Sequence, residues 1–74
     1  PDKNIDMDAE IIDTNGLKIE YDFINPPSIV ATVNDSHNAY IVITEKTNKY
    51  AILKAYTNTG DLTTCKLSLS AKGY

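Results

Sequence analysis

The side chains able to do chemistry are few, and the first group lies near the start of the chain. Acidic and amide side chains occupy alternate positions there: Asp2, Asn4, Asp6 and Asp8. Oxygen ligands at this spacing are typical of the start of a calcium-binding loop. Met7 stands where such a loop needs glycine. We therefore prefer a solvated leader, and keep Asp6 and Asp8 as candidate metal ligands if calcium binds between tandem domains.

His37 and Cys65 are the candidates for acid–base or nucleophilic chemistry. His37 follows Asp35 and Ser36, but residues adjacent in sequence rarely form the geometry that a catalytic triad needs. A plain polar turn over residues 34–38 is the preferred interpretation, because these side chains bond to their own backbone. The single cysteine shares one face of its predicted strand with Leu67 and Leu69 and is expected to be a small buried side chain. The sequence thus predicts no catalytic residues, and an enzyme or redox protein remains the alternative.

A third group could bind a ligand without chemistry. Tyr50, Ile52, Lys54 and Tyr56 occupy alternate positions of one β-rich run, and Tyr40 joins them if its run is the neighbour. Exposed aromatic side chains with polar partners bind sugars or proteins in many modules. Packing beneath a loop or an edge strand is the competing interpretation, since tyrosine also favours strands intrinsically.

Composition limits the classes of function. The chain has 74 residues, seven Lys against ten acidic residues, and a formal charge of −3. One domain is expected at this length. Without a basic cluster we expect no nucleic-acid partner. No apolar stretch reaches the ~18 residues of a membrane span, so we expect no membrane insertion. No glycine-rich phosphate loop, cysteine pair or histidine pair is present, and no cofactor is predicted.

The elements that must position these groups are short runs with period-two alternation, separated by turn signals. We expect strands over residues 9–13, 17–24, 28–33, 39–44, 50–57 and 62–70. Asn15 and Gly16 predict a type I′ hairpin between the first two runs. No window has apolar residues at helical spacing, so no helix longer than a turn is expected.

Alternation on both faces favours an antiparallel β-sandwich over a single open sheet. We expect a flexible leader or linker over residues 1–8 and one sandwich domain over residues 9–74. The predicted core is Leu17, Ile19, Tyr21, Phe23, Ile29, Ala31, Val33, Ile41, Ile43, Ala51, Leu53, Ala55, Cys65, Leu67 and Leu69.

The second half of the chain resembles a known family. Residues 28–33 read Ser-Ile-Val-Ala-Thr-Val, residues 50–57 place Ala51, Leu53 and Ala55 on one face, and Gly60-Asp61 precedes a closing run with Cys65 in register. In this order the runs resemble group 2 bacterial immunoglobulin-like domains. The tryptophan usual before the Val-Ala-x-Val strand is absent, and Asn48-Lys49 replaces a usual glycine.

The resemblance implies an all-β fold, an immunoglobulin-like antiparallel β-sandwich of about six to seven strands. It also implies an extracellular location, on the bacterial cell surface or in a phage virion. There such modules are non-catalytic structural spacers or adhesion domains of larger proteins. Implied partners are neighbouring domains of the parent protein, with a cell-surface glycan or protein as a further candidate. The alternative function is a glycan- or cell-wall-binding module that uses loops 34–38 and 58–61 or the Tyr50/Tyr56 face.

Overall fold

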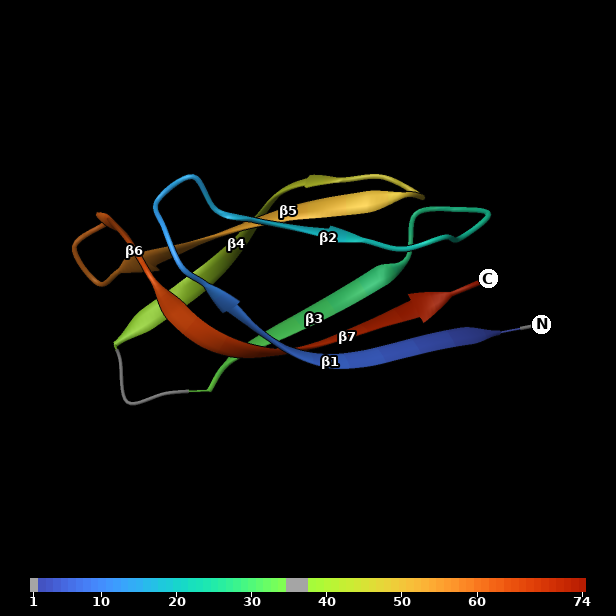
Figure 1. Cartoon of the computed structure of the whole chain (residues 1–74), viewed down its shortest axis with the longest axis horizontal. Coiled ribbons are helices and arrows are strands. Elements are labelled where there is room, and N and C mark those ends of the chain that lie inside the picture. The colour runs from blue at the N-terminus through green and yellow to red at the C-terminus, as the bar shows by residue number, and fades with distance from the viewer. Residues whose placement is uncertain (1, 35–37) are drawn as a thin grey trace.

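The computed structural model describes residues 2–34 and 38–74, and this part of the chain is all β (Figure 1). Its strands are β1 (Lys3–Ile11), β2 (Leu17–Glu20), β3 (Ser28–Val33), β4 (Ala39–Lys46), β5 (Tyr50–Thr57), β6 (Leu62–Thr63) and β7 (Cys65–Gly73). No helix in the described ranges is long and apolar enough to cross a membrane.

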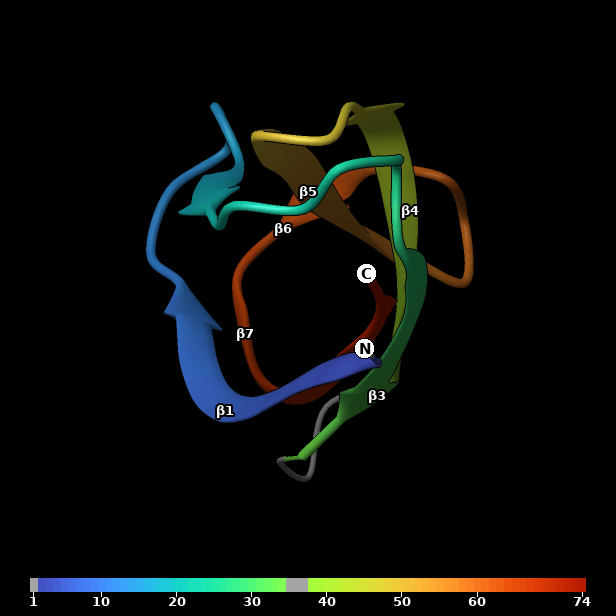
Figure 2. The same cartoon turned by 90° about the vertical axis from the view of Figure 1, so that its right-hand side faces the viewer.

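Two antiparallel sheets pack face to face. One has the order β1-β7-β3, and the other has the order β2-β5-β4 with β6 also paired to β5. Viewed from the end, β5 lies across the core from β1, while β3 and β4 run beside each other along one side (Figure 2). The expected antiparallel β-sandwich is therefore confirmed.

The core lies between β5 and β7, the central strands of the two sheets. Alternate residues of each strand point inward, so Ala51, Leu53 and Ala55 meet Leu67 and Leu69 there. Every residue that the alternation assigned to the core is either buried or packs against the buried cluster. Three further buried residues were not predicted: Ile11, Pro27 and Ala71.

The prediction of a flexible leader over residues 1–8 is wrong for residues 3–8. Lys3 to Asp8 form most of β1, and each residue lies opposite a residue of β7, from Lys3 opposite Gly73 to Asp8 opposite Ser68. The physical reason is an alternation that the acidic composition obscures. Ile5 and Ala9 pack against the core, while Asp6 and Asp8 face solvent.

The hairpin expected at Asn15-Gly16 is also wrong. β1 and β2 belong to different sheets and are not paired. A type I′ turn needs two residues with positive φ, but in the described residues only Gly16 (φ 94°) and Gly60 (φ 89°) have it. Residues 12–16 instead carry the chain from one sheet across to the other.

Two predicted runs are divided or shortened. The run 17–24 is a regular strand only to Glu20, although the amides of Tyr21 and Phe23 still donate to the carbonyls of Lys49 and Asn48, both at 2.9 Å. The run 62–70 is one crossing of the sandwich that changes sheet: β6 pairs with β5, and after Thr64 the chain continues as β7 in the other sheet.

Candidate functional site

The four candidate binding residues of β5 share the solvent side of their sheet. Tyr50, Ile52, Lys54 and Tyr56 are all half-buried, whereas the residues between them point into the core. Central strands have neighbours on both edges, so side chains from β2, β4 and β6 surround these four. The alternation thus placed them on one face, and the neighbouring strands determine what each side chain can do.

Tyr56 lies at the apolar half of this face. Its ring stacks on the ring of Tyr40 from β4, with centroids 5.7 Å apart and planes at 22°. Tyr40 and Tyr56 lie directly opposite each other, and Leu62 of β6 is opposite Tyr56 on the other edge. Tyr40 is 49% exposed and Leu62 is 41% exposed. With the adjacent Val42, these residues form the apolar strip: Tyr40, Val42, Tyr56 and Leu62.

Tyr50 has a different environment at the other half of the face. Its hydroxyl donates a hydrogen bond to the carboxylate of Glu45. That hydrogen bond, together with partial burial and the negative charge of Glu45, raises the pKa of Tyr50 above its usual value. The ammonium of Lys18 lies 4.7 Å from the centroid of the same ring. Because Glu45 and Lys18 already contact the hydroxyl and the ring of Tyr50, the aromatic surface open to an external ligand is that of Tyr40 and Tyr56.

Register explains why this arrangement was only partly predictable. A β-bulge interrupts the pairing of β4 and β5 between Ile43 and Glu45. If the register of the pair Glu45 and Ile52 continued along β4 without the bulge, Tyr40 would lie opposite Thr57 and not opposite Tyr56. Alternation gave the face of Tyr40, but no local signal specified the bulge that aligns it with Tyr56.

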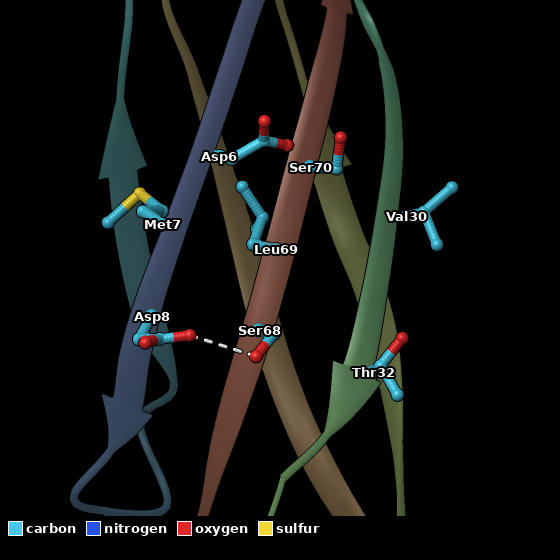
Figure 3. A pocket seen from close by; sticks show the side chains of 8 residues that line it. All are labelled: Asp6, Met7, Asp8, Val30, Thr32, Ser68, Leu69 and Ser70. Carbon is cyan, nitrogen blue, oxygen red and sulfur yellow. Dashed lines mark hydrogen bonds between the residues drawn. The ribbon is translucent and has the colours of Figure 1, made fainter.

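Asp6 and Asp8 lie on the solvent side of the other sheet, beside a shallow hollow of about 370 Å³ (Figure 3). The hydroxyl of Ser68 donates to Oδ1 of Asp8 at 2.9 Å, and the side-chain amide of Asn34 donates to Ser68 at 3.1 Å. Within residues 2–34 and 38–74, no three His, Cys, Asp or Glu side chains are grouped closely enough to hold a metal ion. The two candidate ligands are thus neighbours on one strand face, and calcium binding remains a prediction.

Cys65 is buried, with 3% of its surface exposed, and lies opposite Ile11 at the start of β7. Its predicted place in the core is therefore confirmed. Asp35, Ser36 and His37, the residues of the hypothetical triad, lie outside the described residues.

Two loops were candidates for ligand binding. Residues 58–61 join β5 to β6 at the end of the sandwich opposite the chain termini (Figure 1). The amide of Gly60 donates to the carbonyl of Thr57 at 2.9 Å, and the amide of Thr57 donates to that of Asp61 at 2.8 Å. Of the loop 34–38, residues 35–37 lie outside the described part, but β3 ends and β4 begins at the same end.

No family model, no curated protein and no solved structure matches this chain.

Proposed function

We propose that this chain is a non-catalytic, immunoglobulin-like module of a larger phage virion or bacterial cell-surface protein, and that it works as an adhesion domain that presents its far end. The observation that carries the proposal is the pairing of β1 with β7. Lys3 lies directly opposite Gly73, so β1 begins and β7 finishes at the same end of the sandwich. The opposite end, which we call the distal end, carries residues 12–16, the last residues of β3, the first residues of β4 and residues 58–61.

The strand order supports an immunoglobulin-like arrangement. In that fold strands B, E and D are neighbours in one sheet, and strands C, F and G are neighbours in the other. The order β2-β5-β4 corresponds to B-E-D, and β3-β7 corresponds to C-F. β1 then takes the place of the last strand, G, and pairs antiparallel with β7 as G does with F. The departure from the family pattern is that this strand comes from the beginning of the chain.

The positions of the ends favour presentation over the spacer role that the resemblance also implied. A module placed in line between two neighbours transmits load along its strands, so its chain should enter at one end and leave at the other. Here a continuation from either terminus would leave from the same end. Neighbouring domains of the parent protein would then lie beside the termini, and the distal end would face a cell-surface glycan or protein.

Single-molecule pulling tests this distinction. With handles fused to both termini, force should break the pairs of β1 and β7 one after another, beginning at Lys3 and Gly73. With one handle at the N-terminus and the other at residue 59 through Thr59→Cys, force should load the β1–β7 bonds together in shear. We expect a lower unfolding force in the first geometry. Equal forces would contradict the presentation role and favour a load-bearing spacer.

The apolar strip favours a second candidate function, which is glycan binding. Apolar sugar faces pack on aromatic rings, and hydrogen-bonding side chains at the rim give orientation. The stacked rings of Tyr40 and Tyr56 supply the first requirement, and Lys54, which lies between Ile52 and Tyr56 on this face, supplies the second.

A glycan array with the purified domain tests the second candidate. Binding that disappears in Tyr40→Ala and in Tyr56→Ala, but persists in Val30→Ala, would support it. Val30 is a suitable control because it is 65% exposed on the solvent side of the other sheet. Binding that is lost equally in all variants, or no binding at all, would contradict the glycan role of the apolar strip.

A further inference from the structure

We propose that β1 is an exchangeable strand, which one copy of this chain can donate to β7 of a second copy. The interaction surface is the edge of β7 that β1 covers, and the partner is the same nine-residue segment from another molecule. This goes beyond the proposed adhesion role, because it assigns the chain a route to self-association through its own N-terminal strand.

β1 is attached to the rest of the molecule mainly through β7. It is an edge strand, and β7 is its one partner in the sheet among the described residues. The pairing is continuous over nine positions, from Lys3 opposite Gly73 to Ile11 opposite Cys65. Without β1, β7 would keep β3 on one edge and expose a row of unpaired backbone groups on the other. Such an edge is a template for another strand.

The side chains of β1 are complementary to this edge on both faces. On the core side, Ile11 is fully buried opposite Cys65, and Ala9 packs on the core opposite Leu67. On the solvent side, Asp8 accepts a hydrogen bond from Ser68 at 2.9 Å. The edge of β7 that β1 covers therefore has an apolar side and a polar side, and the side chains of β1 match both.

The connection from β1 to β2 can act as the hinge. Residues 12–15 are exposed, with Ile12 at 72%, whereas Gly16 is half-buried beside Leu53 where β2 is about to begin. Two local hydrogen bonds stabilise the turn. The backbone amide of Asn15 donates to Oδ1 of Asp13 at 2.8 Å, and the backbone amide of Gly16 donates to the backbone carbonyl of Asp13 at 3.3 Å. Because β1 and β2 are unpaired, opening this turn breaks no strand pairing between them.

A second copy is the favoured donor because exchange preserves every contact. The β1–β7 pairs that form within one chain form again between two chains, so the net cost lies in the hinge and in association itself. Exchange of an identical element is a low-cost route to dimers for this reason, and its extent rises with protein concentration. The place of β1 supports this too, since the strand that completes the sheet beside β7 comes from the far end of the chain.

Cross-linking between two differently tagged copies of the full chain tests the proposal. One copy carries Asp8→Cys and the other carries Ser68→Cys, both in a Cys65→Ala background. Residues 8 and 68 lie directly opposite each other, and opposed Cα atoms in antiparallel pairs are close enough for a disulfide. The copies are unfolded together, refolded at high concentration and oxidised. We expect a covalent heterodimer on non-reducing gels.

The control mixes the Asp8→Cys copy with a Thr44→Cys copy, whose exposed cysteine lies on the other sheet. A single chain with both Asp8→Cys and Ser68→Cys establishes that the bond can form. Heterodimer no more abundant than in the control mixture, while the double variant oxidises within one chain, would overturn the proposal. The unsubstituted chain gives a second measurement: after refolding at low and high concentration, light scattering should show a dimer fraction only at high concentration, and monomer in both would also overturn it.

Discussion

Gly16 and Gly60 offer a matched pair of substitutions that separates backbone strain from steric contact. Both glycines have a positive φ, at 94° and 89°. Replacing either glycine by alanine, which is strained at such a φ, costs about 1–2 kcal/mol of folding free energy. The surroundings differ. A Cβ on Gly16 would lie 2.7 Å from the carbonyl oxygen of Leu53 and 2.9 Å from Cγ of Lys54, whereas a Cβ on Gly60 would have nothing within 4 Å.

The contact at Gly16 adds a second cost because its neighbour cannot yield. The oxygen belongs to the backbone of β5, the central strand, and Leu53 is fully buried. Overpacking against such a neighbour costs about 1–3 kcal/mol. We therefore expect Gly60→Ala to lower the free energy of unfolding by about 1–2 kcal/mol, and Gly16→Ala to lower it by about 2–5 kcal/mol.

Urea unfolding followed by circular dichroism measures both variants. The free energy of unfolding of a domain of this size is roughly 4–11 kcal/mol. Gly16→Ala should therefore lower the urea concentration at the midpoint strongly, while the slope of the unfolding free energy against urea concentration stays constant. In thermal melts each kcal/mol corresponds to about 4–8 °C. Equal losses for the two variants would refute the close approach of Gly16 to β5, and a larger loss at Gly60 would refute the open surroundings of its loop.

Four further outcomes are expected. Leu53→Ala should cost about 2–5 kcal/mol in the same unfolding assay, because the side chain is fully buried. Tyr21→Phe should cost about 1–2 kcal/mol, since the Tyr21 hydroxyl lies 2.7 Å from two backbone carbonyls. Burial raises the pKa of Tyr21. The stability that its neutral phenol contributes is therefore complete below about pH 10 and is lost as the pH rises through the raised pKa. Above that pH, the free energies of unfolding of the wild type and Tyr21→Phe should converge in alkaline unfolding experiments. Because the described residues hold no group of three possible metal ligands, millimolar calcium should leave the amide signals of Asp6 and Asp8 unchanged in NMR; shifts of these two signals would contradict this and support calcium binding there.

The facing of side chains was predictable because it depends on a local repeat. A strand turns each successive side chain to the opposite face, so the alternation in residues 50–57 separated Leu53 from Tyr56 without any knowledge of the partner strands. The same reasoning placed Cys65 in the core. Turn residues then marked most of the ends, and β3 and β5 occupy the expected ranges 28–33 and 50–57.

β1 shows where local reasoning failed and what signal was present. Ile5, Met7, Ala9 and Ile11 alternate with polar residues, which is the strand pattern. Ala9 and the aspartates, however, are weak strand formers, and the acidic residues suggested a solvated segment. The segment becomes a strand because β7, about 60 residues away, supplies its hydrogen bonds and core contacts. Strand pairing over such a separation is a tertiary effect, and propensity cannot report it.

Gly16 illustrates the same limit for turns. The Asn15-Gly16 pair predicted a hairpin because that turn needs positive φ at both residues. In the structure the glycine serves a different purpose: it brings β2 against the backbone of Leu53, where no side chain fits. Both arrangements require glycine, so the residue type alone could not distinguish a local hairpin from a close approach to a distant strand.

The position of the chain ends follows from a simpler property than strand pairing. The chain crosses the sandwich once in each of the strands β1 to β5. β6 and β7 together make one further crossing, because both run in the direction opposite to β5. An even number of crossings returns the chain to the end from which it started. A seven-strand immunoglobulin sandwich, with an odd number, sends its ends to opposite sides. The proposed role of a module held at one end, in place of an in-line spacer, rests on this count of crossings over β1 to β7, and the pulling experiment measures its mechanical consequence directly.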